Sequence, residues 1–95
     1  MNGPVDQDCL RLSGTLCLAG VDELVRGLQA HIADAAAPVV RVDLAGVVDV
    51  DTAALQVLVA ARRTAEQAGK SLVLSSANET VRDRLRLTGL LFLCE

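Results

Sequence analysis

Apolar residues in the central third of the chain follow three patterns in succession. A run rich in Val over residues 39–44 predicts a strand, and residues 45–50 are predicted to form a short loop. Apolar residues then recur at helical spacing as far as Gly69, and a second apolar run over residues 71–74 predicts another strand. The segment as a whole predicts a βαβ unit whose helix begins at Asp51-Thr52.

The flanking segments predict further strands and helices. Leucines alternate with other residues over 10–12 and 16–18, on either side of the turn-forming Ser13-Gly14-Thr15, which predicts a short N-terminal hairpin. Helical spacing predicts one helix over residues 21–35 and a shorter one that ends at Gly89. Residues 90–93 are predicted as a last edge strand.

Two helix starts carry good capping residues. Asp51 is a favourable N-cap for the central helix, with Thr52 as the alternative. Residues 76–79 fit a capping box that begins at Ser76, and Asn78 is the alternative cap. Because loops at the same end of parallel strands converge, we expect these two helix starts to lie close together.

Composition excludes several classes of function. The 95-residue chain has a net charge of −3, one Phe and no Tyr or Trp, which disfavours nucleic-acid binding. Its three cysteines lack Cys-x-x-Cys spacing and it has one His, so we expect neither a zinc site nor a cofactor. With no leader or membrane-span pattern in the sequence, we expect a cytoplasmic domain at residues 8–95, preceded by a loose tail at 1–7.

Several short motifs occur in a characteristic order. Gly14-Thr15-Leu16 is followed by Asp43-Leu44-Ala45-Gly46-Val47, by Asp51-Thr52-Ala53-Ala54-Leu55 and by Thr88-Gly89-Leu90. The ordered set resembles the STAS domains of bacterial anti-sigma factor antagonists and sulfate transporters. The resemblance implies an α/β fold with a mixed, mostly parallel sheet and helices packed on it, in which the C-terminal helix is short or absent.

The resemblance implies a partner-switching protein-interaction module. In such antagonists a kinase that is itself the anti-sigma factor phosphorylates a Ser at the start of the central helix. The usual acceptor position is occupied here by Ala53, which has no hydroxyl, and Thr52 is the neighbouring candidate phosphosite. The implied partner is an anti-sigma factor or a histidine-kinase-like ATPase.

A second resemblance is to the STAS subunit of the bacterial ABC transporter that maintains outer-membrane lipid asymmetry. Its implied partner is the ATPase subunit of the transporter, which it binds in the cytoplasm without a requirement for phosphorylation. Both resemblances imply the same docking surface. The residues assigned to it are Val48, Asp49, Val50, Asp51, Thr52, Ala53, Ser75, Ser76 and Asn78.

Two other interpretations concern charged residues. Asp49-Val50-Asp51-Thr52 superficially resembles the motif of aspartate-nucleophile phosphatases, but the chain is too short for the further ligands that this chemistry needs, so we expect no enzymatic activity. Arg82, Arg84 and Arg86 are interpreted as a solvated helix face, with pairing to an acidic partner as the alternative. The sequence does not determine the oligomeric state.

Overall fold

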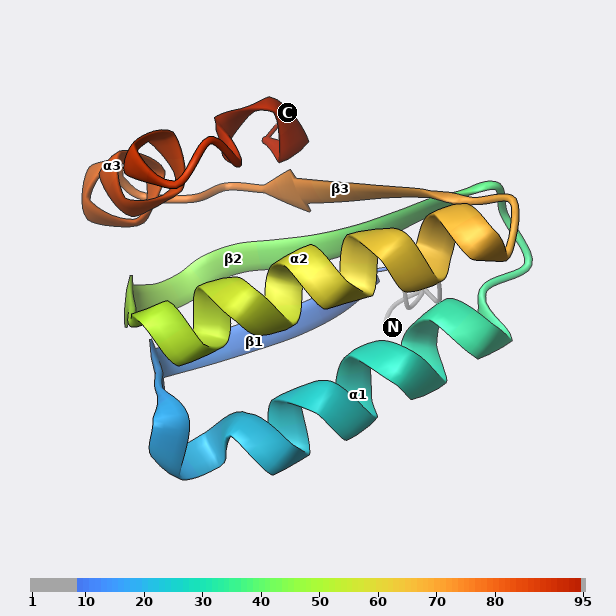
Figure 1. Cartoon of the computed structure of the whole chain (residues 1–95), viewed down its shortest axis with the longest axis horizontal. Helices are drawn as coiled ribbons and strands as arrows, with labels where there is room; N and C mark the ends of the chain where they lie inside the picture. Colours follow the sequence, from blue (N-terminus) through green and yellow to red (C-terminus); the bar gives the residue numbers. More distant parts are fainter. Residues whose placement is uncertain (1–8, 95) are drawn as a thin grey trace, which may run out of the picture.

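The computed structural model describes residues 9–94 as a three-stranded parallel sheet with three α-helices (Figure 1). The predicted tail at residues 1–7 lies outside the described residues. The elements, in chain order, are β1 (Cys9–Leu16), α1 (Val21–Asp34), β2 (Val39–Val50), α2 (Thr52–Gln67), β3 (Ser71–Ser75) and α3 (Glu79–Leu87). Short 3₁₀ turns at Leu18–Gly20 and Leu91–Leu93 precede α1 and follow α3.

The sheet order β1-β2-β3 follows the chain, and both strand pairs are parallel. Crossovers between parallel strands are nearly always right-handed, so two successive crossovers in one direction place their helices on the same face of the sheet. Figure 1 shows α1 and α2 side by side on one face, with α3 at the end of the sheet where β2 finishes. Within residues 9–94, every helix is too short or too polar to cross a bilayer.

The core lies between the sheet and these helices. Every second residue of the first half of β2 is fully buried (Val40, Val42 and Leu44), as expected of a strand with one covered face. α1 contributes Leu24, Leu28 and Ile32, and α2 contributes Leu58 together with several alanines that allow close packing. The predicted mostly parallel α/β fold and the short C-terminal helix are therefore confirmed.

Three local predictions are wrong. The N-terminal hairpin does not form, because residues 9–16 are one strand that pairs in parallel with β2. The predicted loop at residues 45–50 instead continues β2, since β1 is long enough to pair with it. The predicted strand at residues 90–93 is replaced by the 3₁₀ turn Leu91–Leu93, and within the described residues this segment meets β3 through a single bridge between Cys94 and Leu74.

Candidate functional site

Two β-bulges shape the end of β2. β2 has one residue more than β1 before Gly46 and a second extra residue between Val47 and Asp49. A bulge leaves the extra residue unpaired and bends the strand. The second extra residue is Val48, whose side chain is 63% exposed. The bulge therefore presents an apolar side chain to solvent just before α2.

Asp51 fixes the start of α2. Its Oδ1 accepts a hydrogen bond of 2.9 Å from the N–H of Ala54, and its Oδ2 accepts one of 2.9 Å from the N–H of Leu18. These backbone hydrogen bonds, with Ala54 the larger cause, lower the pKa of the Asp51 carboxyl below its ordinary value. Asp51 is thus the N-cap of α2, as predicted, and it also ties the turn before α1 to this helix start.

Thr52 is the first residue of α2 and does not cap it. Its side chain is exposed, and within residues 9–94 its hydroxyl makes no hydrogen bond. The backbone N–H groups of a helix's first turn carry positive potential that favours negative groups. Thr52 therefore presents a free hydroxyl beside a helix N-terminus, whereas the following Ala53 is half-buried.

Asn78 connects the start of α3 to the bulged end of β2. Its Oδ1 accepts a 2.8 Å hydrogen bond from the N–H of Val81, which makes it the N-cap of α3. Its Nδ2 donates to the carbonyls of Val47 at 3.0 Å and Val48 at 3.3 Å. The pairing of β3 with β2 ends at Ser75 and Asp43. The side chain of Asn78 therefore bonds to carbonyls in the part of β2 that, among the described residues, has no partner strand on this side. Of the two predicted caps, the structure selects Asn78 over Ser76.

Asp49 is held by Arg84 of α3. The guanidinium makes two hydrogen bonds, Nε to Oδ1 at 3.0 Å and Nη2 to Oδ2 at 3.1 Å. The N–H of Val50 also donates to Oδ1, at 2.8 Å. Hydrogen bonding to Arg84, followed by that to Val50, lowers the pKa of the Asp49 carboxyl, and the same pair raises the pKa of Arg84. Arg84 is therefore more than a residue of a solvated helix face.

The structure brings together most of the residues assigned to this surface and separates two of them. Val48, Asp49, Asp51, Thr52, Ala53 and Asn78 gather around the start of α2, and Ser76 follows β3 in a left-handed conformation with φ of 61°. Val50 is 3% exposed, so its side chain belongs to the core. Ser75 pairs with Asp43, before both bulges, and lies farther from Val48.

Leu18 is a site residue that the sequence did not reveal. It is 68% exposed, and its N–H is bonded to Asp51, which places it beside the start of α2. The predicted hairpin assigned it to a strand, and a single leucine carries no other signal. Leu18 and Val48 are thus two exposed apolar residues at the end of the molecule where α2 begins, whereas both nearby carboxylates, Asp49 and Asp51, accept hydrogen bonds from internal donors. This arrangement suits protein binding rather than proton transfer.

Comparison with known proteins gives a consistent family and fold. A family model described as "Mlab, STAS domain" matches residues 2–92. A structure of the anti-sigma factor antagonist SpoIIAA in its unphosphorylated form is 18% identical, with a TM-score of 0.78 over 92% of this chain and 76% of that chain. A sulfate transporter family protein from Wolinella succinogenes is 17% identical, with a TM-score of 0.75 over 95% and 74% of the two chains.

A third similar structure is the STAS domain of a SulP transporter from Vibrio cholerae, which is 20% identical, with a TM-score of 0.67 over 90% of this chain and 65% of that chain. No curated protein matches the chain. At these identities the structural similarities show the fold alone.

Proposed function

The chain belongs to the STAS family of protein-interaction domains, and from this premise we propose that it is a non-catalytic docking module that binds a regulatory protein through the start of α2. The observation that carries this proposal is that Thr52, which is exposed and has a free hydroxyl, lies at the same end of the molecule as two exposed apolar residues, Val48 and Leu18. A few well-packed, desolvated residues near the centre of an interface carry most of its binding free energy. Leu18 and Val48 are the anchors that this surface offers.

The first candidate partner is an anti-sigma factor or a histidine-kinase-like ATPase, as in anti-sigma factor antagonists. In this proposal the module binds its partner without a phosphate switch at residue 53, because Ala53 has no hydroxyl. Thr52 is the candidate acceptor if the partner is a kinase. A phosphate there would interact favourably with the N–H groups of α2 and would add about two negative charges to the docking surface.

The second candidate partner is the ATPase subunit of a lipid-transport ABC transporter, with this chain as its cytoplasmic STAS subunit. The match of residues 2–92 to the family model described as "Mlab, STAS domain" favours this candidate. In this case Thr52 is a contact residue and needs no modification.

The two candidates are tested by binding measurements with purified partners. Histidine-kinase-like ATPases and ABC ATPase subunits of the source organism would be immobilised, and their affinities for the wild-type chain and for Thr52→Glu compared. We expect Thr52→Glu to weaken binding to the true partner roughly tenfold or more, because it places a charge among apolar contacts. Thr52→Ser should bind like the wild type.

The matched control is Gln67→Glu, which adds the same charge at an exposed position in the last turn of α2, far from the proposed surface. It should leave the affinity for the partner unchanged. Equal binding by Thr52→Glu and wild type, combined with loss of binding in Gln67→Glu, would show that the docking surface lies elsewhere.

A further inference from the structure

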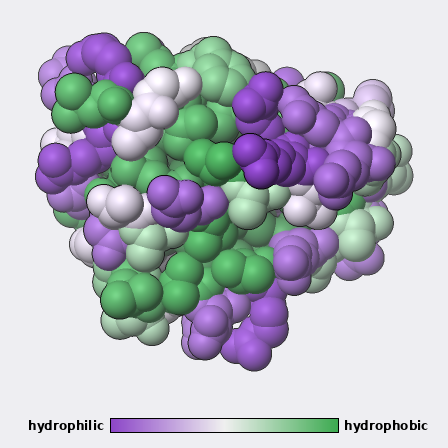
Figure 2. Space-filling model, viewed as in Figure 1, coloured by the Kyte–Doolittle hydropathy of each residue, from purple (hydrophilic) through white to green (hydrophobic). Residues whose placement is uncertain are grey.

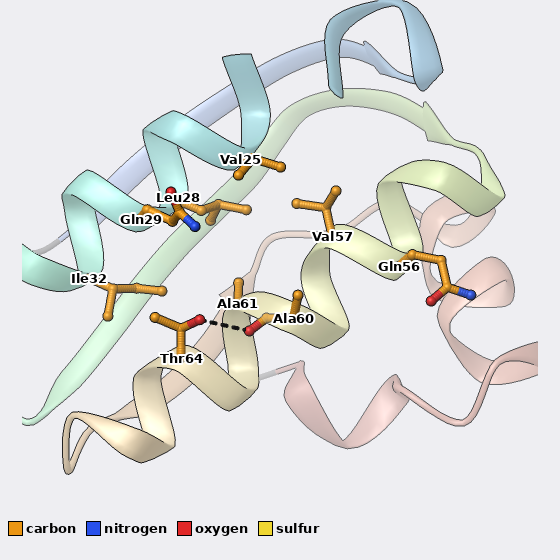
Figure 3. A pocket seen from close by; sticks show the side chains of 9 residues that line it. All are labelled: Val25, Leu28, Gln29, Ile32, Gln56, Val57, Ala60, Ala61 and Thr64. Carbon is orange, nitrogen blue, oxygen red and sulfur yellow. Dashed lines mark hydrogen bonds between the residues drawn. The ribbon is translucent and has the colours of Figure 1, made fainter. Parts of the chain in front are cut away.

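An apolar groove runs between α1 and α2 on the face of the molecule that is seen in Figure 2. Its volume is about 180 Å³. Its apolar lining consists of Val25, Leu28 and Ile32 from α1 and Val57, Ala60 and Ala61 from α2 (Figure 3). Figure 2 shows apolar surface gathered over these helices, with polar surface around it. None of the residues assigned above to the docking surface lines this groove.

The groove contains little that would recognise a polar ligand. The hydroxyl of Thr64 donates to the carbonyl of Ala60 at 3.0 Å, and Figure 3 shows its methyl group directed towards Ile32. Gln29 and Gln56 are the other polar residues of the lining. Pockets for small molecules usually enclose roughly 300 Å³ or more and direct several polar groups at the ligand, so this groove is a poor pocket of that kind.

The dimensions of the groove suit one face of a helix. It extends from Val25 to Ile32 along α1 and from Gln56 to Thr64 along α2, which corresponds to about 11–12 Å at 1.5 Å per residue. A helix of the same length presents about two turns, with apolar residues at positions i, i+3 or i+4, and i+7. An apolar cavity of roughly 150 Å³ admits benzene, so the groove has room for one large apolar side chain as an anchor.

Two arginines next to the residues that line the groove indicate which charge the flanks of that helix should carry. Arg26 lies one turn before Gln29 on α1, and Arg63 lies one turn after Ala60 on α2. Both arginines are exposed, and neither has an ion-pair partner within residues 9–94. The nearby carboxylates are Asp22 and Glu23 in the first turn of α1 and Glu66 on α2, and Glu66 pairs with Arg62 at 3.2 Å. Each of the two helices thus carries, beside the groove, one exposed arginine without an ion-pair partner in the described part of the chain, and these arginines complement acidic residues beside the apolar face of a bound helix.

We propose that the α1–α2 groove binds an amphipathic helix of a partner protein, with its apolar face in the groove and acidic residues facing Arg26 and Arg63. The groove is continuous with the docking surface, because Thr52, Gln56 and Ala60 are exposed at successive turns of α2. This inference rests on the proposed function in that the same partner would supply the helix. It adds a second contact region and the chemistry that the partner presents there.

The test uses a displayed library of helical peptides about 14 residues long, a length of about four turns. Each peptide carries Leu or Phe at the i, i+3 and i+7 positions, with either Glu or Lys on the flanks. Selection against the full-length wild-type chain should enrich peptides with Glu flanks. The best of them, labelled with fluorescein, would then be titrated with the chain and its variants by fluorescence anisotropy.

Ala60→Glu should weaken binding of that peptide roughly tenfold or more, because it places a charged side chain on the groove wall. Ala36→Glu is the matched control: Ala36 is an exposed alanine between α1 and β2 that does not line the groove, and this variant should change affinity less than about twofold. The double variant with Arg26→Glu and Arg63→Glu should favour peptides with Lys flanks.

Failure of the library to yield any groove-binding peptide would overturn the proposal, as would equal binding of the selected peptide by Ala60→Glu and wild type. Enrichment of Lys-flanked peptides by the wild type would overturn the charge assignment. If the chain bound a fluorescent fatty acid but no peptide, and Ala60→Glu abolished that binding, the occupant of the groove would be an acyl chain and the helix proposal would be wrong.

Two outcomes separate this inference from the proposed function. If Thr52→Glu releases the full-length partner and Ala60→Glu does not, the docking surface stands and the groove proposal fails. If a peptide binds in the groove and no protein partner is sensitive to Thr52→Glu, the groove proposal stands and the docking surface fails.

Discussion

The two ends of the sheet are tied together in similar ways but present different surfaces. At the end where the strands begin, Nζ of Lys70 donates to the carbonyls of Ile32 at 2.6 Å and Ala35 at 2.8 Å, and so joins the end of α1 to the end of α2. At the other end, hydrogen bonds between side chain and backbone join the start of α2 to the turn before α1 through Asp51, and the start of α3 to β2 through Asn78.

The two ends differ in the side chains that stay exposed near these hydrogen bonds. Near Lys70, the backbone is closed by the left-handed Gly69 and by the hydrogen bond from the N–H of Ser71 to the carbonyl of Pro38. Around Asp51, the bulge in β2 and the turn before α1 leave Val48 and Leu18 in solvent. The first end is thus closed by internal hydrogen bonds, whereas the second adds exposed apolar residues to its internal hydrogen bonds and is the end where we propose the docking surface.

The largest effect that we predict is for Asn78→Ala. The change removes the N-cap of α3 and both side-chain hydrogen bonds to the carbonyls of β2. A cap contributes typically about 1 kcal/mol and the remaining hydrogen bonds a similar amount, so the free energy of unfolding should fall by about 2 kcal/mol. In a domain of this size the melting temperature should fall by roughly 10 °C, which calorimetry would measure.

The same variant addresses the proposed function. Because Asn78 holds the carbonyl of Val48, its loss should also weaken partner binding under conditions where the variant is fully folded. Asn78→Asp separates the two roles, since it keeps the capping oxygen and replaces the donor to β2 with a carboxylate oxygen. If both variants bound the partner with the affinity of the wild type, Asn78 would have no role in the docking surface.

A smaller effect is predicted for Lys70→Met at the opposite end of the sheet. The change keeps a long apolar side chain and removes two charge-assisted hydrogen bonds to carbonyls at the end of α1. The free energy of unfolding should fall by about 1.5 kcal/mol, as measured by urea denaturation. Partner binding should not change, and a loss of binding in folded Lys70→Met would contradict the division between the two ends.

Gly69→Ala should have a still smaller effect at the same end. Gly69 has φ of +76°, a left-handed conformation that costs a residue with a Cβ atom about 1 kcal/mol. The N–H groups of Gly69 and Lys70 close the helix on the carbonyls of Glu66 and Ala65, and they would remain in place. Urea denaturation should show this loss without any change in partner affinity. Unchanged stability would mean that the end of α2 relaxes more easily than its geometry indicates.

Sequence patterns predicted correctly those elements whose boundaries depend on neighbouring residues alone. Helical periodicity, the capping residue Asp51 and the left-handed Gly69 are local features, and the central helix was placed correctly from them. The end of β2 could not be predicted in this way, because residues 45–50 become a strand only by pairing with β1, which is distant in sequence. The exposure of Val48 follows from the register of that pairing.

The same limit applies to the site. The convergence of Asn78 with residues 47–51 followed from the rule that loops at one end of a parallel sheet meet, and the structure brings them together. Leu18 and Arg84 were not assigned to the site, since each reaches it by a contact with a residue more than 30 positions away in sequence. Such contacts leave no trace in local composition.

Acid should affect the two ends of the sheet differently, and this is the most sensitive test of the comparison. The pKa values of Asp49 and Asp51 are lowered in the folded protein, so their contribution to stability is complete above the ordinary carboxyl pKa of about 4. That contribution is lost as the pH falls through the lowered native values. The ties that Lys70 and the backbone make at the other end use no carboxylate.

An NMR titration from about pH 6 to pH 2 would follow backbone amides at both ends, across the range in which carboxyl groups titrate. The amides of Leu18 and Ala54, which donate to Asp51, should shift together with a midpoint below that of an unperturbed carboxyl group. The amides of Lys70 and Ser71 should not follow this titration.

Asp51→Asn, which retains a capping oxygen but cannot titrate in this range, should abolish the shift at Leu18 while leaving the chain folded. A midpoint at the ordinary value would mean that the carboxylate of Asp51 does not hold the start of α2 in solution, and the rigid helix start on which the docking proposal depends would be lost with it.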